Sequence, residues 1–337
     1  TLALGFVTII STAQNWDAGS RTRVDMGGDN DQFTTEQRVS LGASWGGDGW
    51  SINASGNANY TLTENNGNGA VGFAFNEANA STDLMGFATV TVGRQALDYG
   101  SGSVMGSNPW GSNPNTRDGG VFAINNDMLD LDFGLYKNNA GDGVDEGTSN
   151  YFVNASKSDG DWSLNMLYMS NEDESSAMGL DFGYSMMGGD MDLAVSYNTA
   201  SGWADEDDED MMSIGATYNV NDDMSISATR TTYGEGGFDM DGSNIGGWAS
   251  HGNMGYLGAN DEDMSIGASY GMGDFSIGLA MHKVTNSEDE DYERNVTEAN
   301  LSYTMSDNAN VSIKYATDNN GGDDDDKYMW LTLSINP

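Results

Sequence analysis

Apolar and polar residues alternate with a period of two along most of this chain. In the stretch 50–62, one face consists of Trp50, Ile52, Ala54, Gly56, Ala58, Tyr60 and Leu62. The other face holds only serine, asparagine and threonine. A period of two indicates a β-strand, because successive side chains leave opposite faces of the pleat. The length suits a tilted strand that crosses a bilayer, which takes about 9–11 residues, with lipid on one side and water on the other.

The same alternation recurs almost to the C-terminus, and short and long connections alternate between the predicted strands. The short ones are turns rich in glycine and aspartate, such as 46–49, 158–161 and 271–274. The long ones are 98–116, 138–148, 171–176, 199–210, 233–261, 285–294 and 318–327. This rhythm predicts an all-β fold, a transmembrane antiparallel up-and-down β-barrel of about 18 strands, with 16 as the alternative. Short periplasmic turns and long acidic extracellular loops would then mark its two ends.

The first fourteen residues differ from everything after them. An apolar run over 1–10 is followed by the small residues Ser11, Thr12 and Ala13, as at the cleavage site of a secretory signal, but no basic region precedes it. Residues 1–14 are therefore either a signal remnant or a retained periplasmic segment or extra strand. The barrel is predicted as a single domain over 15–337.

Composition narrows the functional classes. The chain of 337 residues carries 52 acidic and 12 basic residues, a net charge of −40, which repels nucleic acid. It has no cysteine, so disulfides, thiol chemistry and cysteine-based zinc sites are excluded. No apolar run reaches the 18 residues of a transmembrane helix candidate. An acidic all-β adhesin or surface-layer module stays as the alternative to a membrane barrel.

Arginines on the polar side of the first two strands are the candidate pore residues. Arg21, Arg23 and Arg38 would face the lumen, where they avoid the cost of about 2–4 kcal/mol for such a charge on the lipid face at mid-membrane. Arg94 and Arg117 flank the loop 98–116, which is rich in Gly, Ser and Asn and could fold into the lumen.

We therefore predict a constriction with a transverse electric field that selects solutes by charge. The acidic residues that would face the arginines are Glu36, Asp25, Asp98 and Asp118. The alternative is that arginine–aspartate pairs only hold the folded loop to the inner wall.

The region around this loop also carries a family resemblance. Its features are Val92-Gly93-Arg94-Gln95 with Leu97 and Tyr99, Met105-Gly106, Trp110, Arg117-Asp118-Gly119, Arg21 and Arg23, and Thr35-Glu36-Gln37-Arg38. Over roughly residues 16–125 the chain resembles the alginate-export family of outer-membrane β-barrels and its porin-like relatives in Bacteroidetes. The resemblance implies a monomeric barrel of about eighteen strands whose lumen passes hydrophilic solutes. The chain departs from the family at Ala96, where relatives often carry an acidic residue. Its lumen also has fewer lysines and arginines than a polyuronate channel would suggest.

Acidic clusters crowd the predicted extracellular loops and are candidates for calcium. The residues concerned are Asp205, Asp207, Asp208, Asp210, Asp323, Asp324 and Asp325, although none has EF-hand spacing. The alternative is a solvated, self-repelling rim. No other cofactor is expected. A Ser/His/Asp site would need His251 or His282, and neither lies in a recognisable motif, so no enzyme is predicted.

These observations together predict a porin of the bacterial outer membrane, in contact with outer-membrane lipid and lipopolysaccharide. Small hydrophilic solutes would diffuse passively through its water-filled lumen. The alternative within transport is export or uptake of an acidic oligo- or polysaccharide. The alternative from another class is a structural or adhesive barrel with a plugged lumen. A monomer is favoured over a trimer.

Overall fold

We describe the fold from a computed structural model. It describes residues 14–27, 33–62, 71–108, 111, 113–124, 126, 128–137, 147–203, 208–240, 242–245, 255–322 and 324–336. Within these ranges all regular secondary structure is β-strand, and none of them contains a helix long and apolar enough to span a membrane. The candidate signal or periplasmic segment 1–14 lies outside the described residues except for Gln14.

Eighteen strands follow one another in these ranges. The first nine are β1 (Gln14–Asp25), β2 (Thr34–Gly47), β3 (Trp50–Thr61), β4 (Gly72–Leu84), β5 (Ala88–Gln95), β6 (Arg117–Ile124), β7 (Asp130–Lys137), β8 (Ser149–Asp159) and β9 (Trp162–Asn171). The other nine are β10 (Ser176–Met186), β11 (Met191–Ser201), β12 (Asp208–Asn221), β13 (Met224–Tyr233), β14 (Asp261–Met272), β15 (Phe275–Asn286), β16 (Glu293–Ser306), β17 (Ala309–Asp318) and β18 (Asp326–Ile335).

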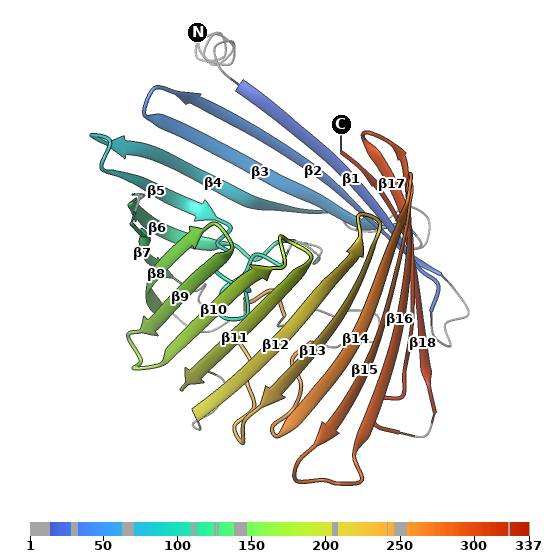
Figure 1. The fold of residues 1–337 in the computed structure, drawn as a ribbon. Helices are drawn as coiled ribbons and strands as arrows, with labels where there is room; N and C mark the ends of the chain where they lie inside the picture. Colours follow the sequence, from blue (N-terminus) through green and yellow to red (C-terminus); the bar gives the residue numbers. More distant parts are fainter. Residues whose placement is uncertain are drawn as a thin grey trace.

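The sheet is closed on itself (Figure 1). Each strand pairs antiparallel with its neighbours in sequence, and β1 also pairs with β18, from Ser20 opposite Ile335 to Asp25 opposite Trp330. Closure leaves none of the 18 described strands at an open edge of the sheet, which a bilayer requires because lipid cannot satisfy backbone hydrogen bonds. The predicted all-β, up-and-down barrel of 18 strands is confirmed.

The apolar rows found in the sequence lie on the outer face of the barrel. Ile266 on β14 faces Met281 on β15, and Ala268 faces Leu279, so neighbouring strands build one continuous apolar surface. These side chains are exposed, Ile266 by 69% and Met281 by 63%, because only lipid covers them. Trp16 and Trp50 stand on the same outer face close to the short turns, where aromatic residues suit a membrane interface.

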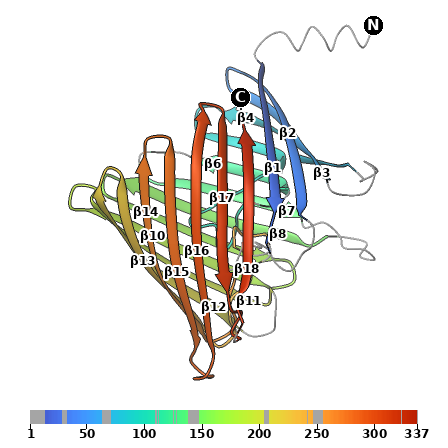
Figure 2. The ribbon, with the colours of Figure 1, turned by 90° about the vertical axis from the view of Figure 1, so that its right-hand side faces the viewer.

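The barrel has one end with tight turns and one with long loops (Figure 2). At the turn between β14 and β15, Gly273 has a φ of +60°, a backbone conformation that glycine adopts without strain. β1 begins and β18 ends at this turn end, as an even strand number requires. One of the predicted long connections is shorter in the structure. The acidic loop predicted over 199–210 ends earlier because Asp208 already pairs in β12.

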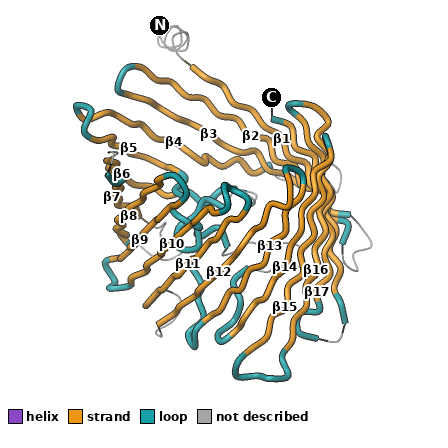
Figure 3. The backbone as a smooth tube through the Cα atoms, in the orientation of Figure 1, coloured by secondary structure: helices purple, strands orange, loops and turns teal. Residues whose placement is uncertain are grey.

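Two of the long connections do not stay at the rim. The connection between β5 and β6 and the one between β13 and β14 turn inward, and Figure 3 shows their described parts as loop segments inside the ring of strands. The fold therefore places irregular backbone in the lumen, where it can find hydrogen-bond partners that lipid would not offer.

Candidate pore constriction

The loop between β5 and β6 is attached to two opposite walls of the barrel. Gly111 in this loop accepts hydrogen bonds from Nη2 of Arg21 at 2.9 Å and from Nη1 of Arg38 at 3.0 Å. At the other side, the backbone N–H of Ser101 donates to Oδ2 of Asp181 on β10 at 3.0 Å. Since β1 and β10 are diametrically opposite in a ring of 18 strands, this loop crosses the lumen.

The loop between β13 and β14 is locked onto the first loop by the side chain and backbone of Asn244. The N–H of Asn244 donates to the carbonyl of Gly102 at 2.8 Å, and its Oδ1 accepts from the N–H of Asn108 at 2.8 Å. Its Nδ2 donates to Oδ1 of Asp98 at 3.1 Å. A Cβ at Gly106 would lie 2.3 Å from Oδ1 of Asn244, so the close approach of the loops requires a glycine there.

Tyr256 adds a second attachment between the two loops. Its hydroxyl donates to the carbonyl of Ser103 and is 2.9 Å from Oγ of Ser243. Burial raises the pKa of the Tyr256 hydroxyl above its usual range, so the group keeps its proton at physiological pH. The two loops thus form one hydrogen-bonded body within the lumen, which we call the plug (described residues of 96–116 and 234–260).

The plug packs on the inner wall through an apolar cluster that the sequence analysis did not anticipate. Its buried members are Leu97, Val104, Met105, Val121, Tyr136, Phe152, Leu167, Met169, Ala177, Ala200, Met211, Tyr233, Phe238 and Met240. Strands β6 to β13 contribute the wall residues, at positions expected to face water. Gly134 makes room for one of them, because a Cβ there would lie 1.9 Å from the ring of Phe152. The plug therefore covers the inner face of eight of the 18 strands near the loop end.

Arg117 holds this plug and does not line an open pore. Its side chain is buried, donates to the carbonyls of Gly106 at 3.3 Å and Gly242 at 2.6 Å, and lies 5.5 Å over the ring of Tyr136. Asp98 likewise serves within the plug, since its Oδ1 accepts from the N–H of Ser107 at 2.7 Å besides Asn244. For these two predicted site residues, the contacts match the alternative in which charged groups hold the folded loop.

The three arginines of the first two strands, Arg21, Arg23 and Arg38, lie on the lumenal face of the wall. Arg21 is opposite Arg38 and Arg23 is opposite Glu36 in the pairing of β1 with β2, on the face away from lipid. Arg23 is 5% exposed and its guanidinium lies 5.5 Å from the ring of Trp330 on β18. Asp25 lies on the same face at the C-terminal end of β1, where its Oδ1 accepts a hydrogen bond from the N–H of Gly27 at 3.0 Å.

Arg94 and Asp118 are a correction to the predicted constriction. They face each other across β5 and β6 and form a two-fold hydrogen-bonded ion pair, at 2.7 Å and 2.6 Å. Arg94 shares its face with Val92, which is 58% exposed on the lipid side. The pair therefore lies on the outer face of the barrel, because residues two apart in a strand point the same way.

The wall that the plug leaves uncovered carries further charges. On β16 and β17, Glu298 pairs with Lys314 at 2.9 Å. Both residues line a hollow of about 380 Å³ together with Asn300, Ser312 and Thr332. The cationic groups of β1, β2 and β17 thus lie on both sides of the β1–β18 seam, with β18 between β17 and β1.

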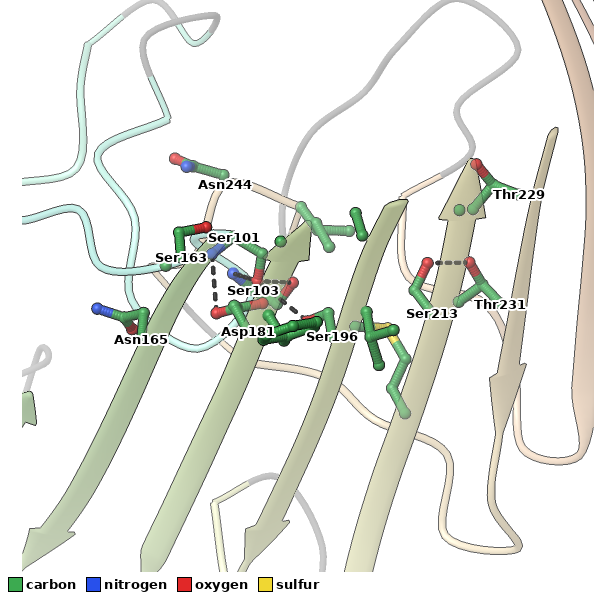
Figure 4. A pocket seen from close by; sticks show the side chains of 18 of the residues that line it. Ser101, Ser103, Ser163, Asn165, Asp181, Ser196, Ser213, Thr229, Thr231 and Asn244 are labelled. Carbon is green, nitrogen blue, oxygen red and sulfur yellow. Dashed lines mark hydrogen bonds between the residues drawn. The ribbon is translucent and has the colours of Figure 1, made fainter. Parts of the chain in front are cut away.

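A larger hollow of about 970 Å³ lies beside the plug, lined by β8 to β14. Small polar side chains lie among apolar ones in its lining, and Figure 4 draws Ser163, Asn165, Ser196, Ser213, Thr229 and Thr231 among them. Asp181 faces Ser101 of the plug at its edge, and Ser213 and Thr231 share a hydrogen bond at 3.0 Å. Hydroxyl and amide groups of this kind offer a hydrated surface to polar solutes.

The lumen also contains a histidine–aspartate pair. Nδ1 of His282 on β15 is 2.8 Å from Oδ2 of Asp263 on β14. Ser265 is opposite His282 in the strand pairing, but its hydroxyl donates to the carbonyl of Thr229 at 3.5 Å. A serine nucleophile needs a hydrogen bond to its base, and these contacts do not make one. His251 lies outside the described residues.

The residues predicted to bind calcium are only partly described. Asp208 and Asp210 belong to β12 and share its outer face with Met212. Asp324 and Asp325 are the two residues immediately before β18. Asp205, Asp207 and Asp323 lie outside the described residues. Among the residues that the structure describes, no group of three or more His, Asp or Glu side chains is placed to hold a metal ion.

Comparisons with known proteins find a family of outer-membrane channels and several solved structures with a similar fold. The model of a family described as Gram-negative porin matches residues 7–334. The crystal structure of the outer membrane protein OprD from Pseudomonas aeruginosa is similar, with a TM-score of 0.75 and 14% identity, covering 96% of this chain and 93% of that chain. OccK8 (OprE) from the same organism gives 0.73 and 13%, covering 96% and 98%. OccK5 (OpdH), also from P. aeruginosa, gives 0.74 and 15%, covering 96% and 98%. A search of curated protein sequences found no match.

Proposed function

This chain belongs to the Gram-negative porin family, and from that premise we propose that its arginine wall and plug form the selectivity constriction. The protein is an outer-membrane transport channel, not an enzyme, and small hydrophilic solutes diffuse passively through its lumen. What we add is the place of selection. Arg21, Arg23 and Arg38 would act on solutes that pass between the plug and the uncovered wall.

One observation carries this proposal. The plug is hydrogen-bonded to Arg21 and Arg38 at one end and to Asp181 at the other, so it narrows the lumen across its diameter. Solutes are thereby brought close to the wall that carries these three arginines, so the arginine charges act on them over a short distance. At physiological ionic strength the Debye length is about 8 Å, so charges in the narrowest part outweigh the acidic loops at the rim.

Single-channel recording in planar bilayers tests the function as a channel. We expect steady open-channel steps with the purified chain, because hydroxyl, amide and charged side chains are among the residues that line the two hollows in the lumen. Silence over long recordings would instead favour the structural or adhesive barrel, whose lumen is closed by the plug. Reversal potentials in a salt gradient would then report the charge selection.

A relationship to the alginate-export family is a narrower proposal, and acidic saccharides are its substrate class. It is supported by the basic groups Arg21 and Arg38 on the adjacent strands β1 and β2 and Lys314 on β17, two strands from β1, which could contact successive carboxylates. The test is current block by an oligouronate. A neutral oligosaccharide of the same length is the control, and equal block by both would contradict this assignment.

We also propose that the functional unit is a monomer in contact with outer-membrane lipid and lipopolysaccharide. The supporting observation is that one chain closes its own barrel. Cross-linking in native membranes tests it, and a dominant trimer band would contradict the monomer.

Calcium binding at the acidic loops stays a prediction. If Asp205, Asp207, Asp208, Asp210 and Asp323 to Asp325 bind the ion, millimolar calcium should raise the unfolding temperature more than the same ionic strength of sodium. The physical reason is that a divalent cation relieves repulsion among clustered carboxylates. The Asp323→Asn/Asp324→Asn/Asp325→Asn variant should lose part of this difference, and an equal response to both salts would contradict the prediction.

A further inference from the structure

The larger hollow in the lumen has a continuous row of polar side chains across its wall. On successive strands from β9 to β14, each member of this row is directly opposite the next in the strand pairing: Asn165, Asp181, Ser196, Ser213, Thr231 and Asp263. All of them line the hollow of about 970 Å³, and Figure 4 labels all but Asp263. At about 4.8 Å per strand, the positions of Asp181 and Asp263 are about 19 Å apart along the wall. We call these residues the polar row.

Negative charge in this hollow is not balanced by a lysine or an arginine. Asp181 and Asp263 belong to its lining, whereas no lysine or arginine is found among the described residues that line it. The arginines of β1 and β2 stand on the opposite wall, because β1 and β10 are diametrically opposite in the ring. Since the Debye length is about 8 Å at physiological ionic strength, those arginines do not offset the two carboxylates. The hollow therefore attracts cations.

Both ends of the polar row have more hydrogen-bond acceptors than donors. The Oδ1 atoms of Asn165, Asp181 and Asp263 are buried, and no donor of the described residues reaches them. Oδ2 of Asp181 accepts from the N–H of Ser101, so the plug lies against this carboxylate. Oδ2 of Asp263 is 2.8 Å from Nδ1 of His282. Buried acceptors without donors are rare in proteins, and a bound group is one explanation for them. A solute that carries N–H groups supplies what the row lacks.

The hollow also offers apolar surface close to the polar row. Met211 and Tyr233 from the apolar cluster line it on the wall, and Leu257 lines it on the plug. At its other end it reaches Ser158 and Ser163, beside the tight turn between β8 and β9. Sites for small organic molecules combine apolar lining with a few polar groups that fix orientation. A sugar ring has both kinds of surface, whereas a bare metal ion needs only the oxygens.

We propose that the polar row binds solutes that combine protonated amines with hydroxyl groups, which is the chemistry of amino sugars. Amines of the solute pair with Asp181 and Asp263, and its hydroxyls exchange hydrogen bonds with the side chains between them. The hydroxyls of Ser213 and Thr231, 3.0 Å apart, can each donate or accept. The inference rests on the channel function but not on the arginine constriction, because it concerns the opposite wall and a different class of solute.

Block of the single-channel current by a glucosamine trimer tests this proposal, at about pH 6, where amines carry a proton. The N-acetylated trimer has the same length without the charge and is the reference for every variant. For the unchanged protein, we expect a dissociation constant at least about tenfold lower for the charged trimer than for the acetylated one. In Asp181→Asn/Asp263→Asn this ratio should fall close to one. The amide at position 181 keeps an oxygen that can accept from the N–H of Ser101.

Two further variants separate the hydroxyls and the overall charge from the two carboxylates. Ser213→Ala/Thr231→Val removes both members of one hydrogen-bonded pair and should weaken block by both trimers about threefold. Asp222→Asn is the matched control, because it removes a carboxylate from the exposed turn between β12 and β13, outside the hollow. It should leave both dissociation constants as they are in the unchanged protein.

Equal block by the two trimers in the unchanged protein would overturn the proposal. So would an unchanged ratio in Asp181→Asn/Asp263→Asn, or an equal loss in Asp222→Asn, which would mean unspecific attraction to an acidic chain. Unaltered block in Ser213→Ala/Thr231→Val would overturn the assignment to sugars. A loosened plug would change block by both trimers alike, so the ratio distinguishes it from the loss of the carboxylates. Absence of open-channel steps would contradict the channel as well, whereas steps without charge-dependent block would contradict this site alone.

Discussion

Replacing Arg21, Arg23 and Arg38 together by serine is expected to lower the ratio of anion to cation permeability at least about fivefold. A unit charge about 5 Å from an ion contributes about 0.8 kcal/mol even at the dielectric constant of water. That corresponds to about a fourfold change in local ion concentration per charge. The three arginines act on the same narrow passage, and the nearby Glu36 and Asp25 would then be left uncompensated. In a potassium chloride gradient, the reversal potential should move toward the potassium equilibrium potential.

The same substitution removes the hydrogen bonds of Arg21 and Arg38 to Gly111, so charge and attachment must be separated. Arg21→Lys/Arg38→Lys keeps the charge and should keep the selectivity. A triple change on the outer face, Lys137→Gln/Lys283→Gln/Lys327→Gln, removes as many charges and should leave the reversal potential nearly unchanged. Unaltered selectivity in the serine variant would mean that these arginines only attach the plug to the wall.

Substituting Gly106 by valine is expected to raise the single-channel conductance about twofold or more and to add rapid current fluctuations. A Cβ at this position would lie 2.3 Å from Oδ1 and 2.6 Å from the backbone nitrogen of Asn244. The second distance involves backbone, so the two loops must move apart. Overpacking of this kind costs typically about 1–3 kcal/mol. The two loops of the plug would lose their hydrogen bonds at Asn244, while the strands of the wall keep their pairing.

Two further variants make this result interpretable. Asn244→Ala removes the contacts to Asp98 and Asn108 without adding bulk, and it should change conductance in the same direction. Gly72→Val adds the same bulk at a wall position where the nearest atom to a new Cβ is 3.8 Å away, and it should conduct as the unchanged protein does. Unchanged conductance in both Gly106→Val and Asn244→Ala would mean that the plug does not limit flow.

The contrast between wall and plug explains which parts of the fold the sequence reveals. Strand alternation is a local pattern, so residues such as Ile266 and Met281 could be assigned to the lipid face without any long-range information. The apolar cluster had a weaker local signal. At the loop ends of β8, β9 and β12, apolar residues occupy consecutive positions, as in Tyr151-Phe152-Val153 and Met211-Met212. Such runs break the alternation and indicate a wall that is covered on its inner face too.

For the charged candidates, position in the chain was a poorer guide than strand register. Arg94 and Asp118 sit beside the inward loop in sequence, which suggested a place in the constriction. Their register with Val92 and Gly120 turns them outward instead. Arg117 has the opposite register, and its two carbonyl partners belong to loops that are 125 and 11 residues away in the chain.

The sequence alone determined the barrel wall, a strand number of about 18 with 16 as the alternative, the two unlike ends and the lumenal side of Arg21, Arg23 and Arg38. Each of these follows from the two-residue period and from turn composition, which act within a few residues. Only the tertiary structure decided that two distant loops join into one plug and that this plug spans the lumen from β1 to β10. Those contacts depend on backbone groups such as the Gly111 and Gly242 carbonyls, and every residue carries such a group, so no sequence pattern marks them.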